Sequence, residues 1–536
     1  MLKFSAHEYP YPSQRQSVFA QRGMVAASQP LAAQAGIEVM QKGGNAIDAA
    51  IATAAALTVV EPTGCGIGGD AFALVWCKGQ LHGLNGNGHA PAALSIEAVK
   101  AAGHDQMPLY GWTPVTVPGC PSAWAELSQR FGKLPFAELL QPAIRLARDG
   151  FPLSPVVAHQ WQLTLEEFSP HRDAALDAWF DTFLIDGRAP RAGDMFRNPA
   201  QARTLEELAA TRCESLYRGA LAERLDAHSR ASGGYLRASD LQDYRAEWVE
   251  PIHVNYRGVD VWEIPPSGQG LVALMALNIL EGFSFDHRDS QQTWHRQLEA
   301  MKLAYSDGLH YITDPLHMRV AVADLLSDDY SSRRRGQIGE QAQPPKPGDP
   351  HASGTVYLAT ADAEGNMVSF IQSNYHGFGS GVVLPDSGIA LQNRGQEFSL
   401  DPTHANCLAP GKKTFHTIIP GFLTQDGQAL GPFGVMGGYM QPQGHVQMVM
   451  NLVDFGLNPQ AALDAPRWQW LGDMKVGIEQ GASRDLANAL ARRGHQVQMA
   501  SDLTDYGRGQ IILRDPVSGV LCGGTEPRAD STIAVW

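Results

Sequence analysis

The spacing of apolar residues along the chain changes near residue 354. Between Gly119 and Asp307 most apolar residues recur at helical spacing, as in "LVALMALNILEGF" and "QLEAMKLAYSDGLHYI". One strand-like insert, "EPIHVNYRGVDVWEIPP", interrupts this part. After Gly354 the chain is strand-rich, with hairpin-like turns at "DAEGN" and "TQDGQ" and a helical interlude near "QPQGHVQMVMNLVDFG". The pattern therefore predicts a mostly helical part followed by a mostly β part.

The most apolar run of the chain, from Ala49 to Val60, predicts a buried helix. Asn45 is suited to cap the start of this helix, and Pro62 stops it. Twelve residues are too few to span a bilayer, so burial inside a layered domain is the better interpretation. The next segment, "GIGGDAFALVW", predicts a glycine turn followed by a strand. Because the turn follows a helix rather than a strand, it does not match a dinucleotide-binding fingerprint.

A polar segment from Ser327 to Gly354 separates the two parts. It is rich in proline and shows no periodicity, which predicts an exposed, mobile linker. The basic run Arg333–Arg335 is interpreted as part of this solvated linker.

Composition narrows the classes of function. At 536 residues the chain should form two lobes or one large layered domain. A net charge of −14, with no basic stripe interleaved with aromatics, argues against nucleic acid as a partner. The amino terminus lacks the apolar core of a secretory signal, and the six cysteines are scattered. We therefore expect a reduced, cytoplasmic protein with no membrane partner.

Motif searches give no sign of a metal or an organic cofactor. The 18 histidines do not cluster at ligand spacing, and the HExxH and GxxxxGK[ST] motifs are absent. Ser380 lies in "FGSGV", which is not the GxSxG elbow of a serine hydrolase.

Thr355 stands at the border between the linker and the first strand-like run after it. An internal threonine hydroxyl is a poor nucleophile. A threonine at the first position of a chain differs, because its α-amine titrates at about 8 and can act as the base for its own hydroxyl. This chemistry requires cleavage between Gly354 and Thr355. The pattern alone leaves two interpretations open, a terminal nucleophile or an ordinary strand residue.

The expected hairpin adds a partner for Thr355. If "DAEGN" is the turn, Ala361 pairs with Met367, and counting outward places Thr355 opposite Ser373. The serine hydroxyl could then hydrogen-bond the amine or the hydroxyl of the threonine. The alternative is a simple polar cross-strand pair.

The chain resembles the γ-glutamyltransferase family of N-terminal-nucleophile hydrolases along almost its whole length. Many blocks in the same order carry the resemblance, among them "GGNAIDAAIATAAALTVVEP", "GIGGDAF", "GGYLRASDLQDYRAEWVEPIHVNYRG", "IPPSGQG", "EAMKLAYSDGLHYITDP", "MGGYMQPQGH" and "GGTEPRAD". The resemblance implies a four-layer αββα sandwich. It also implies a precursor that cuts itself into a large subunit, residues 1–354, and a small subunit, residues 355–536. The two subunits would form one intertwined domain, and such pairs could dimerise.

The resemblance assigns a catalytic centre. Thr355 falls on the family's nucleophile, and Ser373 falls on the hydroxyl residue that supports it, where the family usually has threonine. Gly437 and Gly438 fall on the glycine pair whose amides form the oxyanion hole. Backbone N–H groups in a glycine turn can approach a developing oxyanion without hindrance from a side chain.

The substrate clamp of the family is rebuilt in this chain. Members that process glutathione hold the γ-glutamyl group with an arginine, an asparagine, an acidic residue and two serines. Here those places fall on Asn87, Tyr375, Glu397, His416 and Thr417. Two residues of "QNRGQEF", Asn393 and Arg394, join these as candidate substrate-binding residues. Arg394 stands where a neutral residue is usual and could supply a relocated cation for a carboxylate.

These departures point to a substrate that differs from a γ-glutamyl group or is smaller. The segments "QSNYHGFGSG" and "LQNRG" look similar to a branch of the family that includes oxamate amidohydrolase. We therefore expect a self-cleaving threonine amidohydrolase that acts on a small, carboxylate-bearing amide and needs no cofactor. One alternative is hydrolysis or transfer of γ-glutamyl groups. The other is a non-catalytic member of the family.

Overall fold

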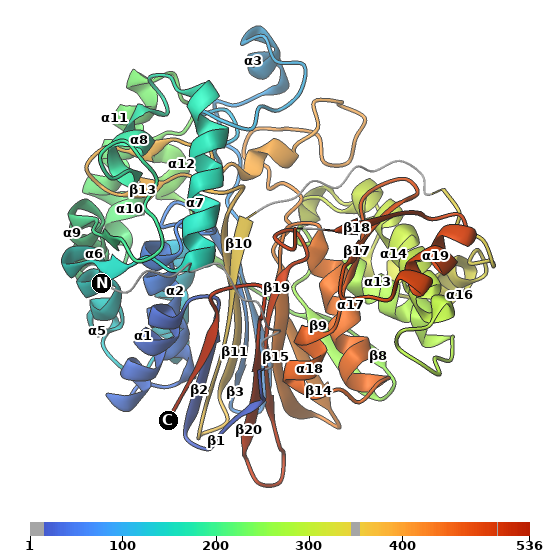
Figure 1. Cartoon of the computed structure of the whole chain (residues 1–536). Helices are drawn as coiled ribbons and strands as arrows, with labels where there is room; N and C mark the ends of the chain where they lie inside the picture. Colours follow the sequence, from blue (N-terminus) through green and yellow to red (C-terminus); the bar gives the residue numbers. More distant parts are fainter. Residues whose placement is uncertain (1–14, 345–353, 501) are drawn as a thin grey trace.

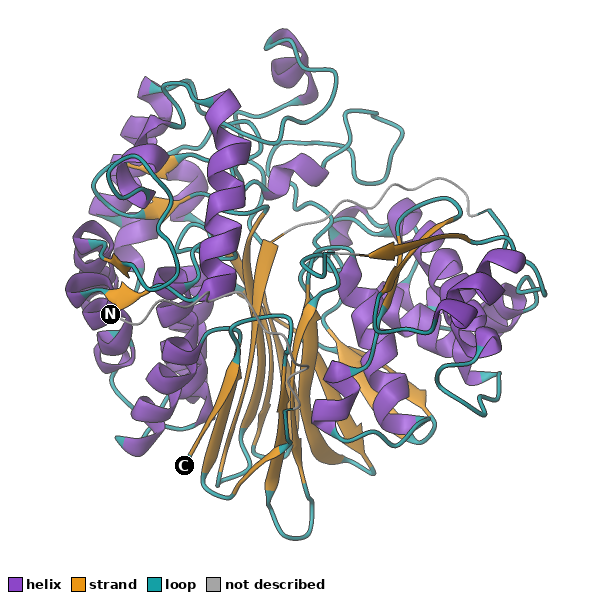
Figure 2. Ribbon diagram, viewed as in Figure 1, coloured by secondary structure: helices purple, strands orange, loops and turns teal. Residues whose placement is uncertain are grey.

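The computed structural model describes residues 15–344, 354–500 and 502–536. Two seven-stranded sheets lie face to face, and helices cover the outer face of each sheet (Figure 1, Figure 2). The predicted αββα sandwich is confirmed. Among the described residues no helix combines the length and apolar character needed to cross a membrane.

The border at residue 354 lies at the start of an inner strand of one sheet. Its strands, in spatial order, are β21 (Thr532–Val535), β2 (Gly23–Ala27), β10 (Gly354–Asp362), β11 (Met367–Tyr375), β3 (Asp70–Cys77), β4 (Gln80–Gly86) and β7 (Glu247–Val249). Strands from both sides of residue 354 are therefore hydrogen-bonded neighbours. The predicted division into residues 1–354 and 355–536 stays a prediction, but the two segments form one intertwined unit.

The second sheet also mixes both segments. Its strands, in spatial order, are β1 (Val18–Ala20), β20 (Leu521–Thr525), β19 (Arg508–Arg514), β15 (Gln428–Met436), β14 (Gly421–Gln425), β9 (Val259–Glu263) and β8 (Ile252–Tyr256). The two facing surfaces enclose an apolar cluster that includes Phe72, Tyr357 and Phe422. Burial of this cluster from both sides holds the sheets together.

Capped helix ends and small side chains stabilise the helical layer on the first sheet. Its main members are α1 (Pro30–Gln41), α2 (Ala46–Val60), α4 (Cys120–Phe131), α6 (Gln141–Asp149), α7 (Pro155–Phe168), α9 (Pro199–Thr211) and α11 (Ala220–Ala231). As predicted, Asn45 caps α2, because its side chain accepts from Asp48 N–H while Asp48 accepts from Asn45 N–H. Every residue of α2 is buried, which its alanine-rich sequence permits.

The layer on the second sheet consists mainly of α13 (Gly270–Glu281), α14 (Gln291–Tyr311), α17 (Met440–Val453), α18 (Pro459–Asp464) and α19 (Arg484–Arg492). A small sheet of β16 (Trp468–Trp470), β17 (Lys475–Glu479) and β18 (Gln496–Ala500) lies beside them. In Figure 1 this layer stands on the right of the sandwich.

The expectation of an exposed, mobile linker without regular structure from Ser327 to Gly354 is wrong for its first third. Helix α16 (Asp328–Arg335) occupies that stretch. Ser327 caps its start, its acids lie in the first turn, and its arginines lie in the last turn, which suits the helix dipole. Arg334 pairs with Asp307 at 2.5 Å, so the basic run is not freely solvated. The proline-rich remainder from residue 345 to 353 lies outside the described residues.

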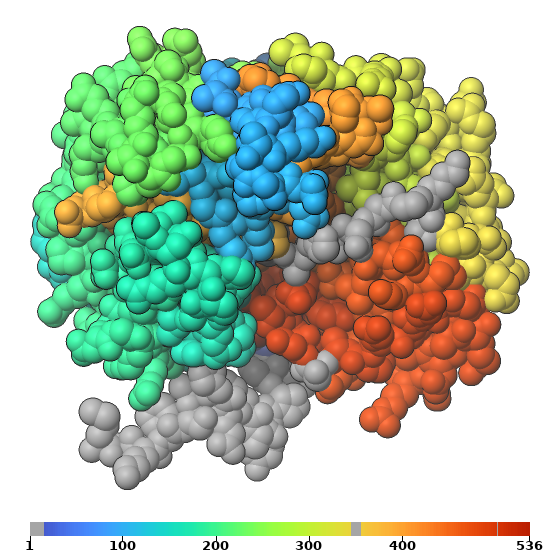
Figure 3. All heavy atoms as spheres, turned by 90° about the horizontal axis from the view of Figure 1, so that it is seen from above, coloured from blue at the N-terminus to red at the C-terminus, as the bar shows by residue number. Residues whose placement is uncertain are grey.

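A cap of loops covers the end of the sandwich at which β10 begins (Figure 1). Helix α3 (Ile96–Ala101) packs through Val99 against Phe398 and Leu400. Figure 3 shows this blue segment lying against the orange segment of the chain on the upper face.

Candidate active site

The predicted pair of hydroxyl groups meets at the open end of the β10–β11 hairpin. Ala361 pairs with Met367 and Val356 with Gln372, as the predicted register requires. The ladder becomes irregular between Gly354 and Val356, and there Thr355 Oγ1 lies 3.1 Å from Ser373 Oγ. Both side chains are buried. The two hydroxyls therefore share a hydrogen bond shielded from solvent.

The Ser373 hydroxyl also contacts the backbone of Tyr375, the last residue of β11. The N–H of Tyr375 donates to Ser373 Oγ at 2.8 Å, so the serine proton is free to point toward Thr355. Tyr375 adopts φ 77°, a left-handed conformation that residues other than glycine rarely adopt. On the other side, a Cβ at Gly69 would lie 2.5 Å from Ser373 O, so only glycine allows the preceding turn to approach this closely.

Asp70 continues the site on the neighbouring strand. It is the cross-strand partner of Ser373, and its Oδ2 lies 2.9 Å from His416 Nε2. Because His416 Nδ1 accepts from Ile418 N–H, its Nε2 carries the proton and donates to Asp70. Burial raises the pKa of Asp70 to about 7, an effect that Arg394 opposes. Burial and Arg394 both lower the pKa of His416.

Arg394 is the cation among the predicted clamp residues. Its guanidinium is fully buried, stacks on the Tyr375 ring at 4.1 Å and donates from Nη1 to Thr417 Oγ1 at 2.7 Å. Among the described residues its Nε and Nη2 have no hydrogen-bond partner. These two groups form one edge of the guanidinium, which is the edge that binds a carboxylate through two parallel hydrogen bonds.

Glu397, another predicted clamp residue, accepts hydrogen bonds from two tyrosines. The hydroxyls of Tyr375 and Tyr439 both donate to its carboxylate, the second at 2.7 Å. Burial, together with Glu397, raises the pKa of both tyrosines, which keeps them protonated as donors. Glu397 and Tyr439 also line a cavity of about 890 Å³, bounded on its other side by α14.

The glycine pair lies at the same end of the sandwich as Thr355. Gly437 follows β15 with φ 135°, and Gly438 has φ 55°. Gly437 shares the wall of a cavity of about 250 Å³ with His376, which directly follows β11. The carbonyl oxygens of the pair are engaged, since that of Gly437 accepts from Met440 N–H and that of Gly438 from Gln441 N–H. The geometry is compatible with the predicted oxyanion hole, a role that stays a prediction.

Two of the predicted clamp residues hold loops together. Asn87 donates to Ser267 Oγ at 2.6 Å and to Thr414 O at 3.1 Å. Asn393 accepts from His376 N–H at 3.1 Å and donates to Leu109 O at 3.0 Å. None of these hydrogen bonds involves the Arg394 guanidinium. Asn87 and Asn393 therefore stabilise the loops that carry the other predicted clamp residues.

Sequence reasoning missed three residues of this site. Asp70 carried a usable signal, because an acid stands between a glycine turn and an apolar strand in "GIGGDAF". Tyr439 directly follows the glycine pair in "MGGYM". Gln269 gave no signal, yet its Nε2 donates to Thr417 O at 2.6 Å and to Gly438 O at 2.8 Å. It thereby links the clamp to the glycine pair.

Sequence comparison places this chain in a known family. The family model for Gamma-glutamyltranspeptidase matches residues 32–536. The chain belongs to this family, and it is an amidohydrolase of the N-terminal-nucleophile class.

The relatives that match this chain are named for different activities. The chain is 37% identical over 532 residues to the oxamate amidohydrolase proenzyme of Klebsiella pneumoniae, covering 96% of this chain and 98% of the relative. It is 35% identical over 524 residues, with the same coverage, to the glutathione hydrolase-like YwrD proenzyme of Bacillus subtilis. Among solved structures it matches a cephalosporin acylase from Bacillus halodurans with a TM-score of 0.97 and 59% identity, over 100% of this chain and 99% of the other.

Proposed function

We propose that the chain cuts itself between Gly354 and Thr355 and then hydrolyses a small amide that bears a carboxylate. The observation that carries the proposal is the buried hydrogen bond between Thr355 Oγ1 and Ser373 Oγ. A threonine hydroxyl needs a base and a fixed orientation to attack a carbonyl. Cleavage would supply the base as the new α-amine, and Ser373 supplies the orientation.

The proposed reaction proceeds through an ester on Thr355. Its Oγ attacks the amide carbon while the α-amine takes the hydroxyl proton. The amides of Gly437 and Gly438 stabilise the oxyanion of the tetrahedral intermediate. The C–N bond then breaks, and the leaving nitrogen takes the proton from the α-ammonium group. Water, activated by the same amine, attacks the ester and releases the acid and the free enzyme.

Arg394 supports the choice of a carboxylate-bearing substrate. A buried guanidinium with an unused edge is costly unless a ligand completes it, and a carboxylate fits that edge through two hydrogen bonds. The rings of Tyr375 and His416 occupy places where small polar residues are usual in the family. They leave less room for the acyl group, which favours an acid as short as oxamate over a γ-glutamyl group.

The experiment compares substrates on the purified protein. Ammonia release from oxamate is measured beside amine release from a γ-glutamyl anilide, each at several concentrations. We expect kcat/KM to be higher for oxamate than for the γ-glutamyl anilide. We also expect the activity toward oxamate to be lost in Arg394→Gln. A γ-glutamyl preference by a wide margin would overturn the choice of substrate, and no turnover of any amide by the processed protein would indicate a non-catalytic member.

A second candidate is hydrolysis of a larger amide whose acyl part ends in a carboxylate. The cavity of about 890 Å³ beside Glu397 and Tyr439 favours it, because a substrate bound to Arg394 could extend there. The resemblance to a cephalosporin acylase supports the same candidate. A glutaryl anilide added to the substrate comparison distinguishes the two, since a narrow acyl pocket would reject it.

A further inference from the structure

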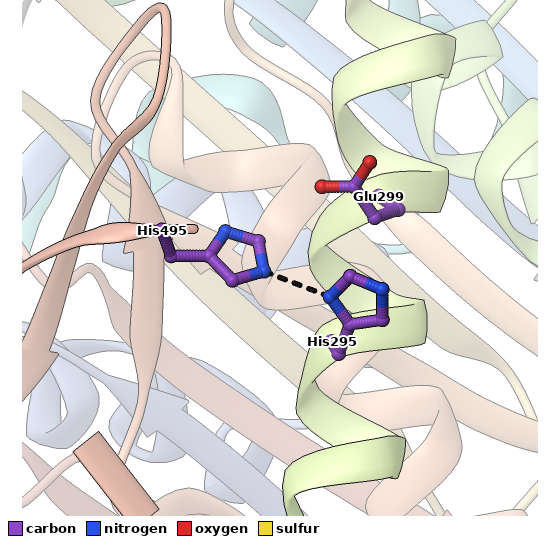
Figure 4. Close-up of side chains that lie close together, drawn as sticks. All are labelled: His295, Glu299 and His495. Atoms are coloured by element: carbon purple, nitrogen blue, oxygen red, sulfur yellow. Dashed lines mark hydrogen bonds between the residues drawn. The ribbon is translucent and has the colours of Figure 1, made fainter. Parts of the chain in front are cut away.

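A cluster of two histidines and one glutamate lies away from the clamp, between α14 and β18 (Figure 4). His295 and Glu299 are one helical turn apart on α14, and His495 directly precedes β18. His295 Nδ1 lies 2.9 Å from His495 Nε2, and one ligand atom from each of the three residues lies within 4.8 Å of the others. All three side chains are buried. No local sequence pattern indicates this cluster, because the two histidines are 200 residues apart.

The tautomer of His295 suits a metal ligand. Its Nε2 lies 2.9 Å from the carbonyl oxygen of Gly339, which can only accept, so Nε2 carries the proton. Nδ1 therefore accepts a hydrogen bond from His495 Nε2–H. When an ion binds between the two rings, that proton moves to His495 Nδ1, which has no hydrogen-bond partner among the described residues. A ring N–H donated to a backbone carbonyl, with the other nitrogen left bare, is the arrangement that orients metal-bound histidines.

Glu299 is held in place by bonds that leave it able to bind a metal. Lys302 donates to Oε1 at 2.8 Å, and Gln343 N–H donates to Oε2 at 3.0 Å. Each carboxylate oxygen has a second lone pair available.

We propose that His295, Glu299 and His495 bind a divalent transition-metal ion, with Zn²⁺ as the best match. Two imidazoles and one carboxylate are a donor set that Zn²⁺ uses, at about 2.0–2.1 Å for each nitrogen. Tetrahedral geometry at that bond length needs the two nitrogens roughly 0.4 Å farther apart than their present contact, a shift that rotation of the His495 ring can supply. A solvent molecule completes the coordination.

The ion would join the two segments of the chain. His295 and Glu299 precede residue 354 and His495 follows it. If the chain is cut there, the metal holds the two subunits together. This consequence rests on the proposed cleavage, whereas the site itself does not.

Metal binding to the full-length protein tests the site. The protein is prepared without a metal-affinity tag, stripped with EDTA and titrated with Co²⁺, whose visible d–d absorption reports tetrahedral coordination. We expect one equivalent to bind, to be displaced by Zn²⁺, and to bind at least tenfold more weakly in His495→Gln and Glu299→Gln. His287→Gln, which removes an exposed histidine, is the matched control and should bind as the wild type does.

Two results would overturn the proposal. One is the absence of Co²⁺ absorption in the wild type. The other is undiminished binding in a folded His495→Gln variant. If that variant does not fold, thermal unfolding of the wild type decides instead. We expect added Zn²⁺ to raise Tm by several degrees, because a ligand of the native state stabilises it. An unchanged Tm contradicts the site.

Discussion

The hydroxyl oxygens of Thr355 and Ser373 lie 3.1 Å apart across the open end of one β-hairpin. Tyr375 N–H donates to the same serine oxygen, and either hydroxyl can be the donor in the contact with the threonine. The contact occurs where the strand ladder becomes irregular, next to a glycine turn that packs closely against the serine. Contacts with Tyr375 and with the glycine turn therefore hold this pair of hydroxyls in place.

Replacing Ser373 by alanine should slow both self-cleavage and turnover. The variant removes the hydrogen bond that orients the nucleophile, and a bond to a charged or reacting group contributes about 1.5–3 kcal/mol, which corresponds to about a 10- to 100-fold loss of rate. Ser373→Thr keeps the hydroxyl and should retain most of the activity. Ser369→Ala is the control, because Ser369 is a buried serine of the same strand that bonds Tyr357 instead. Equal losses in both alanine variants would argue against a specific role.

Replacing Arg394 by glutamine should lower kcat/KM for carboxylate-bearing amides by about 10²-fold or more. Truncating one partner of a buried, hydrogen-bonded charge pair costs about 2–5 kcal/mol. The loss should fall mainly on KM, and it should be small for an uncharged amide of the same size. Arg145→Gln, at an exposed ion pair with Glu38, should change nothing. A loss that is the same for charged and uncharged substrates would contradict the carboxylate site.

Replacing Gly437 by alanine should lower kcat by about 10²-fold, the usual effect of losing one oxyanion donor. At φ 135° an alanine is strained, and its Cβ would lie 3.1 Å from Gly507 Cα, so the amide must move. Gly336→Ala is the control, because its Cβ finds only ordinary contacts. Normal kcat in a folded Gly437→Ala would place the oxyanion hole elsewhere.

Because of Asp70, the free energy of unfolding should fall as the pH rises from about 4 to 7. The pKa of this carboxyl is raised to about 7 in the fold, against about 3.9 in an unfolded chain. Between these values the folded state holds a proton that the unfolded state has lost, so stability falls with pH, by up to about 4 kcal/mol. Above about 7 the contribution is constant.

Denaturant unfolding at several pH values measures this slope. Asp70→Asn should flatten it in part, and Glu61→Gln should do the same, because burial also raises the pKa of Glu61 to about 7. A slope unchanged in Asp70→Asn would mean that the carboxyl is ionised throughout this range.

Much of the fold was predictable because local signals agreed with it. The cap at Asn45 and the apolar run after it specify α2, and the turn residues of "DAEGN" set the register of the hairpin that carries Thr355. Helix α16 was missed because its sequence has no apolar stripe. Its ends are stabilised by charges, and Arg334 finds its partner on α14, which no local pattern reveals.

The site was predictable only in part, for a different reason. Thr355 and Ser373 belong to one hairpin, so counting along the sequence brings them together. Asp70 and Gln269 reach the site through sheet pairing and a loop contact across more than 100 residues. Such long-range contacts depend on the tertiary fold. The free edge of Arg394 is likewise visible only once all its neighbours are placed.

Cleavage at Gly354–Thr355 is the central claim, and mass spectrometry of the purified protein under denaturing conditions tests it most directly. We predict two chains in the wild type, residues 1–354 and 355–536, with the second beginning "TVYLAT" by amino-terminal sequencing. Thr355→Ala should remain a single chain and lack amidase activity. An intact wild-type chain that hydrolyses amides, or a Thr355→Ala variant that is cut at the same bond, would contradict the account.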